Sequence, residues 1–547
     1  MNIEKPYLAL IFALLLFLGV GSLWDHRLQH DFPYAYLASD TFQQQTRAQG
    51  IADAGSYAHE PPYIVKGYTD VIGYYPPVLH HLGILLGNAS GIPLYDAVYF
   101  VVFLAALAAA FVMYAIIRSV SREAALLALP MSILLFSDKS YIGFLWGHWA
   151  SIVGQMFLIC VFWALLRHEL EGSGIMLGLF MGALALSHTS KLLYGVVFVA
   201  LYGAYLLVTA QFTKKFLMGV ALAAVLAGII SAYNLLIFVQ SFQVINPYTF
   251  TISTDWGGTP IFYLTDFGIL LLFMAIGVVA GITLFRKMAV PLMVGIFMLL
   301  VGYANYIGFG IRAFQPRLLW PVYLMFFFGF GLWALIRYAP EKFRLPSLFG
   351  VVGVFLVLFS GMFAIPGVPA YYGISEQGPV QGLMDSWHWE AFQWLSKNTP
   401  ADAKVYFFYG DVYDQDALLR NAKRTHVQVI PEDFVARLQN RSITRTYQSD
   451  TPADHGAGMP YWKSFGKIGL HQREDINGFM WQREYDVCDF DYVVFDKASR
   501  QQALAQYNLL IAQDMAGKGA SLAFQNDVVL VLKNNAKGGD CIEERTF

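Results

Sequence analysis

Charged residues are scarce in this sequence, and their scarcity excludes an ordinary soluble protein. Of the 547 residues, 14% are Asp, Glu, Lys or Arg and 57% are hydrophobic, whereas a soluble domain has roughly 25% charged residues. The mean hydropathy is +0.49. The formal net charge is −2, and no basic cluster of the kind that binds nucleic acid is present. We therefore expect a membrane protein, surrounded by membrane lipids, that does not bind nucleic acid.

Short motifs that identify many enzyme classes are also absent. The sequence has no phosphate-binding P-loop, no G-x-S-x-G, no H-E-x-x-H and no C-x-x-C. Of its three cysteines, Cys160 lies in an apolar run, whereas Cys488 and Cys541 lie in the polar C-terminal part. These two form a disulfide or remain free thiols, depending on whether that part faces an oxidising compartment. The chemistry therefore has to be sought among polar residues that interrupt the apolar sequence.

Long apolar runs occupy most of the chain up to residue 365. Runs of about 16 to 24 residues match the hydrocarbon core of a bilayer, which is roughly 30 Å thick. They lie near residues 7–24, 94–117, 122–137, 146–166, 173–188, 192–211, 216–239, 264–285, 289–310, 317–337 and 346–365. We expect an α-helical polytopic membrane domain of about 11 transmembrane helices over residues 1–365.

Basic residues alternate between the connections of these runs. Every second connection is short and contains Arg118 and Arg122, Arg167, Lys214 and Lys215, Arg286 and Lys287, or Arg337, Lys342 and Arg344. Short basic loops face the cytoplasm. The first long loop, residues 25–93, and the C-terminal part, residues 366–547, are therefore predicted to be extracytoplasmic in a multi-pass protein of the plasma membrane.

The first outer loop contains the leading candidate for a catalytic group. Asp31 follows the first apolar run in H-D-F-P-Y, and a carboxylate at the edge of a lipid-facing cavity can take a proton from an acceptor. The alternative is a helix cap or a solvated loop charge. Asp25 is assigned to loop solvation, and Asp40 to capping of a short helix that Gly50 ends.

A second short helix is predicted later in the same loop. It begins at the proline pair in Y-Y-P-P and extends over Tyr74–Leu86, which is too short to span a bilayer. We expect this helix to re-enter the membrane or lie on its surface, with its aromatic side chains at headgroup level. Tyr75 is a candidate pocket residue.

Cationic and histidine side chains interrupt the later apolar runs. Arg312 and Arg317, at an outer helix boundary, are candidates for binding the phosphate of a donor, because Arg binds phosphate in a bidentate way. Snorkelling to the headgroups is the alternative. His148, His188 and Lys191 are further candidates for a substrate pocket, since ionisable groups inside membranes are often functional. The alternative is that these side chains are hydrogen-bonded packing residues without a function.

Two further segments are relevant to function. Residues 246–260, which include Asp255, form either a mobile lid over a substrate, with Gly257 and Gly258 as hinge, or an ordinary loop. After Pro366 the chain becomes polar. An amphipathic helix over Trp387–Pro400 and short strands at Lys404–Tyr409, Val427–Ile430, Tyr492–Phe495 and Val528–Leu532 predict a C-terminal soluble α/β domain.

The acidic motif after the first helix, the Y-Y-P-P element and S-D-K-S-Y at Ser137–Tyr141 together resemble the GT-C superfamily of membrane glycosyltransferases. The helix over Trp387–Pro400 is similar to the start of the soluble domain in catalytic subunits of oligosaccharyltransferases. The resemblance implies a GT-C-like fold. It also implies inverting transfer of a sugar from a polyprenyl-phosphate or -diphosphate donor to a protein, glycan or lipid acceptor, at the outer face of the cell envelope.

The resemblance also implies roles for acidic residues, and the sequence departs from it in two places. Members that use a metal have a pair of acids in the second motif, where this chain has Asp138 followed by Lys139. Asp138 is thus expected to assist Asp31, directly or by holding a divalent metal with it (Mg or Mn), unless Lys139 replaces the cation. Oligosaccharyltransferases have W-W-D-Y-G where this chain has F-F-Y-G-D at Phe407–Asp411.

Two other classes of protein fit the membrane pattern. A transporter or flippase of lipid-linked sugars would have similar helices, and a non-catalytic scaffold would use the C-terminal domain to bind partners. The long acidic outer loop and large outer domain favour an enzyme. Transporters are often built from internal repeats, and the sequence has none.

Overall fold

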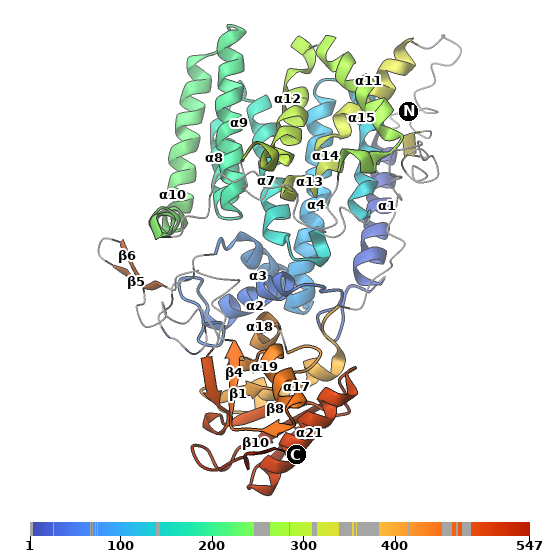
Figure 1. The fold of residues 1–547 in the computed structure, drawn as a ribbon. Coiled ribbons are helices and arrows are strands. Elements are labelled where there is room, and N and C mark those ends of the chain that lie inside the picture. Colours follow the sequence, from blue (N-terminus) through green and yellow to red (C-terminus); the bar gives the residue numbers. More distant parts are fainter. Residues whose placement is uncertain are drawn as a thin grey trace.

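Helices form one end of the molecule and a mixed β-sheet forms the other (Figure 1). The computed structural model describes residues 4–25, 27–65, 67, 69, 71, 73, 75–137, 143–244, 263–283, 285–308, 314–338, 353–354, 357, 382–413, 415–450, 462–466, 469–472 and 483–546. Helices α2 and α3, from the first outer loop, lie between the two ends (Figure 1).

Six helices within the described segments are long and apolar enough to cross a membrane. They are α1 (Glu4–Trp24), α4 (Leu94–Arg118), α7 (Trp149–Leu166), α9 (Thr189–Val208), the first part of α10 (Lys214–Val244), and the span Trp320–Tyr338 made by α14 (Trp320–Tyr323) and α15 (Met325–Tyr338). Shorter apolar helices are α8 (Ser173–Ala185), α11 (Leu270–Thr283) and Ala289–Gly302 within α12 (Phe285–Gly302). The expected number of about 11 spans is therefore not confirmed. Of the expected run 346–365, only residues 353, 354 and 357 are described.

One expected span is broken into two pieces. The run 122–137 forms α5 (Arg122–Ala128) and then a 3-10 helix, η1 (Leu129–Phe136). Pro130 lies at the start of η1, and a proline has no N–H group to continue the α-helical hydrogen bonds. Every residue of η1 is buried, so this segment fills the interior of the helical part.

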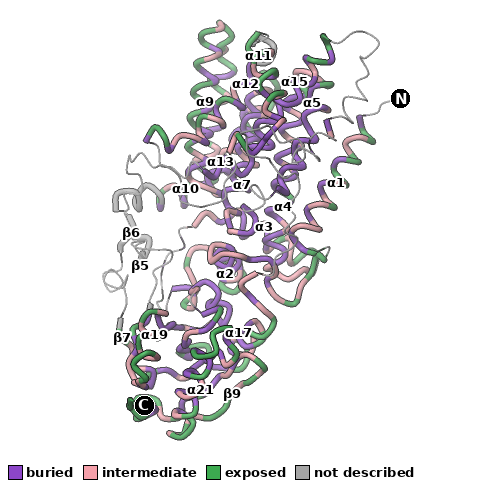
Figure 2. Tube along the Cα trace, turned by 45° about the vertical axis from the view of Figure 1, so that its right-hand side comes forward, coloured by how far each residue is buried: buried purple, intermediate pink, exposed green. Residues whose placement is uncertain are grey.

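The helices differ in how much of their surface the protein covers. In α7, 78% of the most apolar stretch is buried, against 22% in α10. Figure 2 colours the described residues by how far each is buried.

Glycines on α8 allow α10 to approach closely. A Cβ on Gly174 would lie 2.9 Å from the Cα of Gly219. Small residues at such contacts are typical of helices packed within membranes.

The first outer loop folds into two helices. Helix α2 (Ser39–Ala54) is longer than predicted, because Gly50 is buried within it and Gly55, with φ of 66°, ends it instead. Glycine reaches this left-handed conformation without steric cost. Helix α3 (Val78–Ser90) begins directly after the proline pair, as predicted, and at 13 residues is too short to span a bilayer.

A seven-stranded sheet forms the core of the C-terminal part. Its order is β7-β4-β2-β1-β8-β10-β9, with β1 parallel to β2 and β8 and the other pairs antiparallel. The predicted helix and four predicted strands are confirmed as α17 (Ser386–Asn398), β1 (Lys404–Phe407), β2 (Thr425–Val429), β8 (Tyr492–Asp496) and β10 (Val529–Lys533). The remaining strands of this sheet are β4 (Thr446–Asp450), β7 (Arg483–Asp486) and β9 (Ser521–Gln525).

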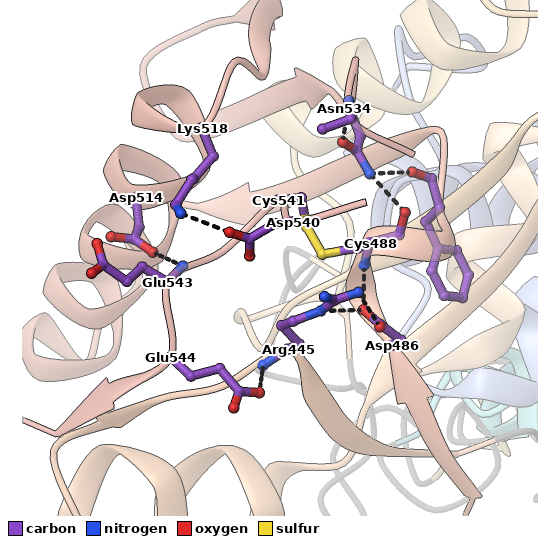
Figure 3. Close-up of a disulfide and its surroundings, with 12 residues drawn as sticks. Arg445, Asp486, Cys488, Asp514, Lys518, Asn534, Asp540, Cys541, Glu543 and Glu544 are labelled. Atoms are coloured by element: carbon purple, nitrogen blue, oxygen red, sulfur yellow. Dashed lines mark hydrogen bonds and ion pairs between the residues drawn. A yellow bond between two sulfur atoms is a disulfide. The ribbon is translucent and has the colours of Figure 1, made fainter. Parts of the chain in front are cut away.

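Smaller elements complete this part of the chain. They are α18 (Asp416–Leu419), η6 (Arg420–Ala422), α19 (Pro431–Gln439), β3 (Ser442–Ile443), β5 (Trp462–Gly466), β6 (Gly469–Gln472), η7 (Val487–Asp489), α21 (Gln502–Gly517) and β11 (Arg545–Thr546). Cys488 and Cys541 are joined by a disulfide with Cα atoms 5.5 Å apart, which decides between the two alternatives for these cysteines (Figure 3). The bond connects η7, after β7, to the C-terminal tail.

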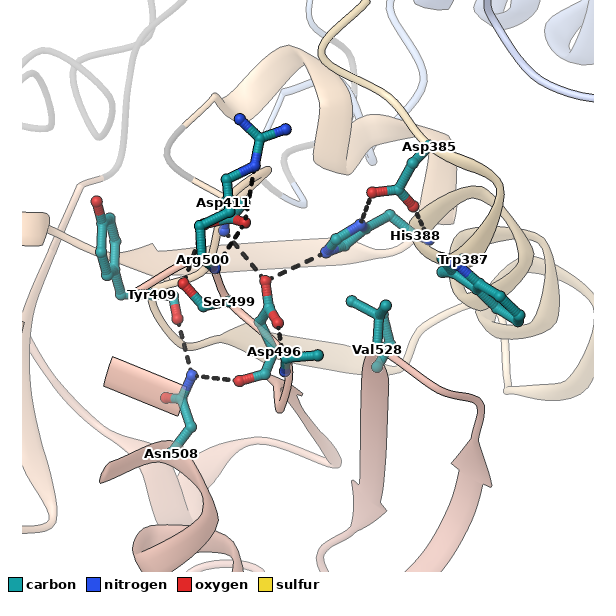
Figure 4. A network of polar contacts seen from close by, with 12 residues as sticks. Asp385, Trp387, His388, Tyr409, Asp411, Asp496, Ser499, Arg500, Asn508 and Val528 are labelled. Carbon is teal, nitrogen blue, oxygen red and sulfur yellow. Dashed lines mark hydrogen bonds and ion pairs between the residues drawn. The ribbon is translucent and has the colours of Figure 1, made fainter. Parts of the chain in front are cut away.

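A charged network joins α17 to the sheet (Figure 4). The Nδ1 atom of His388 lies 2.7 Å from Asp385 Oδ2, and its Nε2 lies 3.5 Å from Asp496 Oδ2. Burial by itself lowers the pKa of His388, but the bonds to the two carboxylates and their charges raise it to about 9. The buried imidazolium therefore links the helix to the carboxyl end of β8.

Candidate functional site

Asp31 lies on the exposed side of the loop that follows α1. The adjacent residue, His30, fixes this loop to the start of α4. Its backbone N–H donates to Asp96 Oδ2 over 2.9 Å, and its carbonyl accepts from the Tyr95 hydroxyl over 2.5 Å. The Tyr95 ring also contacts Trp389 of α17, with centroids 5.4 Å apart. Asp31 is thus near the junction between α4 and the sheet domain.

Asp40 lies deeper, in the first turn of α2. The N-cap of this helix is Ala38, so Asp40 is not the capping residue that the sequence analysis expects. Gly147, with φ of 79°, lets the two backbones touch: a Cβ there would lie 2.4 Å from the Thr41 nitrogen and 2.7 Å from the Asp40 Cβ. The first turn of α2 therefore packs against the segment that leads into α7.

His148 follows Gly147 and extends this contact toward the later helices. Its ring lies 5.1 Å from the ring of Phe314, the first residue of α13 (Phe314–Arg317). The segment also hydrogen-bonds to the loop before α2, because Leu37 N–H donates to the Leu145 carbonyl over 3.1 Å. His148, a predicted pocket residue, thus lies between α2 and α13.

Lys191 lies at the centre of a buried polar group. Its Nζ donates to Gln315 Oε1 over 2.9 Å and lies 3.4 Å from the Ser190 hydroxyl. Gln155 of α7 donates to the carbonyl of Gln315 over 3.1 Å. His188 Nδ1 lies 3.0 Å from the Ser190 hydroxyl. Helices α7, α9 and α13 therefore meet at these five side chains, which we call the polar node.

Arg317 is buried on another side of α13. Its Nε donates to the carbonyl of Gly302, the last residue of α12, over 2.6 Å. Its guanidinium lies over Tyr263, Tyr303 and Trp320, at 4.9, 4.7 and 5.6 Å from the ring centroids. A cation at the C-terminal end of a helix is stabilised by the helix dipole. Arg317 therefore closes α12, and its Nη1 has no hydrogen-bond partner among the described residues.

Three predicted site residues, Asp138, Asp255 and Arg312, lie outside the described residues. Among the residues that are described, no three His, Cys, Asp or Glu side chains gather as metal ligands. The metal held by Asp31 and Asp138 thus stays a prediction.

The sequence analysis did not predict Gln155 and Gln315 as site residues. The signal that could have found them is an amide inside or beside an apolar run.

The arrangement of the helical part, the helices of the outer loop and the terminal α/β domain is shared with a solved structure, which shows a likeness of fold. The apo structure of ArnT from Cupriavidus metallidurans superposes with a TM-score of 0.51 at 12% identity, covering 98% of this chain and 99% of that chain.

Two other solved structures resemble the chain less. They are the same ArnT bound to undecaprenyl phosphate (TM-score 0.47, 12% identity, 98% and 99% covered) and an Archaeoglobus fulgidus oligosaccharyltransferase tethered with an acceptor peptide (TM-score 0.48, 13% identity, 90% and 69% covered). No protein-family model and no curated sequence matches the chain. The likeness is therefore one of fold.

Proposed function

We propose that the protein is a glycosyltransferase that moves a sugar from a polyprenyl-phosphate or -diphosphate donor to a protein, glycan or lipid acceptor at the outer face of the membrane. The observation that carries the proposal is the packing of the acidic first turn of α2 against the segment before α7, within a chain of GT-C architecture. ArnT, which has a similar fold, has been crystallised with undecaprenyl phosphate, and we propose a donor of that class.

The chemistry needs a base and a cation. A carboxylate takes the proton from the acceptor hydroxyl or amide, the acceptor atom bonds to the anomeric carbon, and the phosphate leaves with the electrons of the broken C–O bond. Lys191 is our candidate for stabilising the leaving phosphate, because its buried ammonium is held by an amide oxygen. Arg317 remains a second candidate through its Nη1.

We assign the base to Asp40 rather than to Asp31. Gly147 and His148 connect Asp40 to α13, where the polar node lies, while the contacts beside Asp31 lead to α4 and the sheet domain. Asp31 is then a surface carboxylate.

The proposed orientation places the first loop and the sheet domain outside the cytoplasm. The disulfide between Cys488 and Cys541 supports this, since disulfides persist in oxidising compartments. The contacts between α2 and the sheet domain, such as the ion pair of Asp53 with Lys423, support placing both on one side.

The test compares three carboxylates of the same loop. Asp40→Asn is expected to lower the release of polyprenyl phosphate from lipid-linked sugars by about 10²–10⁴-fold, the usual contribution of a general base. Asp31→Asn and Asp25→Asn should stay within about twofold, as for ordinary surface changes. If Asp31→Asn alone abolished release, Asp31 would be the base. Full release in all three variants would contradict the proposed function.

A further inference from the structure

The loop before α2 passes between the helical part and the sheet domain. Leu37 N–H donates to the Leu145 carbonyl, in the segment before α7, over 3.1 Å. On the other side, the Tyr36 carbonyl accepts from the Leu383 N–H over 2.7 Å, and Leu383 lies just before α17 of the sheet domain. Two adjacent residues are thus bonded to opposite ends of the molecule, a few residues before the proposed base, Asp40.

Gly382 lets the sheet domain approach this loop. A Cβ on Gly382 would lie 2.5 Å from the Tyr36 nitrogen and 2.6 Å from its carbonyl oxygen. Both atoms belong to the backbone, so no side-chain rotation would relieve the collision. The φ of Gly382 lies outside the left-handed region, so the close approach is the reason for a glycine here. A larger residue would have to push the loop away from the sheet domain.

Tyr36 is fixed by its side chain as well as by its backbone. It is 1% exposed, and its hydroxyl donates to the Tyr95 carbonyl of α4 over 2.7 Å. Its ring lies edge-to-face with the rings of Trp149 in α7 and Phe42 in α2, with centroids 5.0 Å apart in both pairs. Such aromatic pairs favour a defined orientation. Tyr36 therefore connects α4, α7 and the first turn of α2.

The turn that contains Tyr36 has an unusual backbone. Ala35 is buried and has φ of 57°, a left-handed conformation that a residue with a Cβ rarely adopts. A backbone of this kind persists only where its surroundings determine it closely. The bonds of Tyr36 to Leu383 and Tyr95 supply that constraint, so the loop has little freedom to shift.

The sheet domain is anchored on its own side of the contact. Asp385 caps α17 by accepting from the His388 N–H over 2.8 Å (Figure 4). Trp389 of the same helix contacts the Tyr95 ring, with centroids 5.4 Å apart. The segment from Gly382 to Asp385 is therefore held between this helix and the loop before α2. Functional groups keep a productive geometry when packed residues on rigid elements support them.

We propose that Gly382, Leu383 and Tyr36 form a clamp through which the sheet domain positions the first turn of α2, and with it Asp40. The proposal rests on the proposed function, in which Asp40 is the base. These three are positioning residues, because they act through Asp40. A displacement of about 1 Å by a change far from the reacting atoms can lower a rate about 10²-fold. Loosening the clamp is expected to lower kcat and to leave KM unchanged.

The test measures release of polyprenyl phosphate from lipid-linked sugars by the full-length protein in lipid nanodiscs. Gly382→Ala is expected to lower kcat by about 10- to 10²-fold, because the loop is displaced, and to change KM by no more than about twofold. Gly517→Ala is the matched control, since a Cβ at the end of α21 would have nothing within 4 Å. It should change neither quantity.

A double-mutant cycle separates positioning from a general loss of structure. If Gly382 acts through Asp40, Gly382→Ala should lower kcat by no more than about twofold in protein that already has Asp40→Asn, because the two changes are coupled. A general structural defect would multiply the two losses. Hydrogen exchange of the amides over residues 36–48 is a readout independent of activity. It should become faster in Gly382→Ala and not in Gly517→Ala.

A milder variant keeps the test valid if Gly382→Ala does not fold. Tyr36→Phe retains the ring and the bond from Leu383 but removes the hydroxyl that donates to the Tyr95 carbonyl. It is expected to lower kcat by about two- to tenfold, the equivalent of one hydrogen bond. This loss should likewise disappear in the Asp40→Asn background.

Two results would overturn the proposal. One is that kcat and amide exchange in Gly382→Ala and kcat in Tyr36→Phe match those of the unaltered protein. The other is that Asp40→Asn lowers kcat and the loss from Gly382→Ala keeps its full size in that background. The proposed function fails separately. If Asp40→Asn kept full release while Gly382→Ala lowered kcat and made exchange faster, the base would be misassigned and the clamp on the first turn of α2 would stand.

Discussion

The two ends of the molecule differ in the groups that contact several of their buried cations. In the sheet domain, Arg420 Nη2 lies 2.7 Å from Asp416 Oδ2, and His388 lies between Asp385 and Asp496. Arg424 is the exception there, because it donates to the Thr399 hydroxyl and to three backbone carbonyls. In the helical part, Lys191 donates to the amide oxygen of Gln315, and Arg317 donates to a backbone carbonyl within a group of aromatic rings.

The partner of a buried cation affects how much positive potential that cation presents to a ligand. A buried cation matched by a carboxylate has its field largely cancelled and holds its elements together. A buried cation that donates to neutral oxygens keeps more of its positive potential, which attracts an anionic group such as a phosphate. We therefore assign the carboxylate-matched networks of the sheet domain to stability, and donor binding stays our proposal for the polar node.

The largest effect that tests this division is expected from the disulfide. Removing it with Cys488→Ser and Cys541→Ser should lower the free energy of unfolding of the sheet domain by about 2–4 kcal/mol. Affinity for a polyprenyl phosphate should be unchanged. Urea unfolding followed by tryptophan fluorescence measures the first quantity. Cys160→Ser, at the buried free cysteine, is the control. A large loss of donor affinity in the double variant would contradict the assignment of the sheet domain to stability and of the polar node to donor binding.

Somewhat smaller is the pH effect expected from His388. Its pKa in the folded protein, about 9, is above the ordinary value of 6.5. The stabilisation is therefore fully present below pH 6.5 and is lost as the pH rises through 9. Over this range, the sheet domain should lose on the order of 2–3 kcal/mol of unfolding free energy. In His388→Gln the pH dependence should flatten. A wild-type profile that is level from pH 6 to 9.5 would show that this histidine is neutral.

For the polar node, the effect that tests its role is on donor binding. Lys191→Met should weaken the binding of undecaprenyl phosphate about tenfold or more, because a charge-assisted bond worth about 1.5–3 kcal/mol is lost. The substitution also leaves Gln315 Oε1 without this buried donor, which should cost about 1–3 kcal/mol of stability, so donor affinity is measured on protein that is still folded. Lys215→Met, at the start of α10 and thus on the predicted cytoplasmic side, is the matched control. Equal affinities in both variants would exclude Lys191 from the donor site.

The sequence predicted those parts of the fold that depend on local patterns. Helix α17 follows from its apolar spacing, and α3 from the proline pair. Strands β4, β7 and β9 were missed. Strands β4 and β7 are short and pair with each other across residues 451–482, whereas β9 pairs locally with β10 but has no buried residue. The end of α2 was misplaced, since Gly50 is tolerated inside the helix by packing against Ile64 and Pro61.

The site was only partly predictable for a related reason. His148, His188 and Lys191 were recognised because ionisable groups are rare in apolar runs, and the structure brings them near α13. Their partners Gln155 and Gln315 come from segments 160 residues apart, a relation that no local pattern contains. The choice between Asp31 and Asp40 likewise depends on Gly147, which is distant in the sequence.

The most direct test is native mass spectrometry of the protein extracted from the membrane in which it functions. The expected result is a bound polyprenyl phosphate, free or sugar-linked, in the unaltered protein and in the Lys215→Met control, and its loss in Lys191→Met. If only ordinary phospholipids were bound, or if the polyprenyl phosphate remained at the same level in Lys191→Met, the claim that the polar node binds the donor would be contradicted.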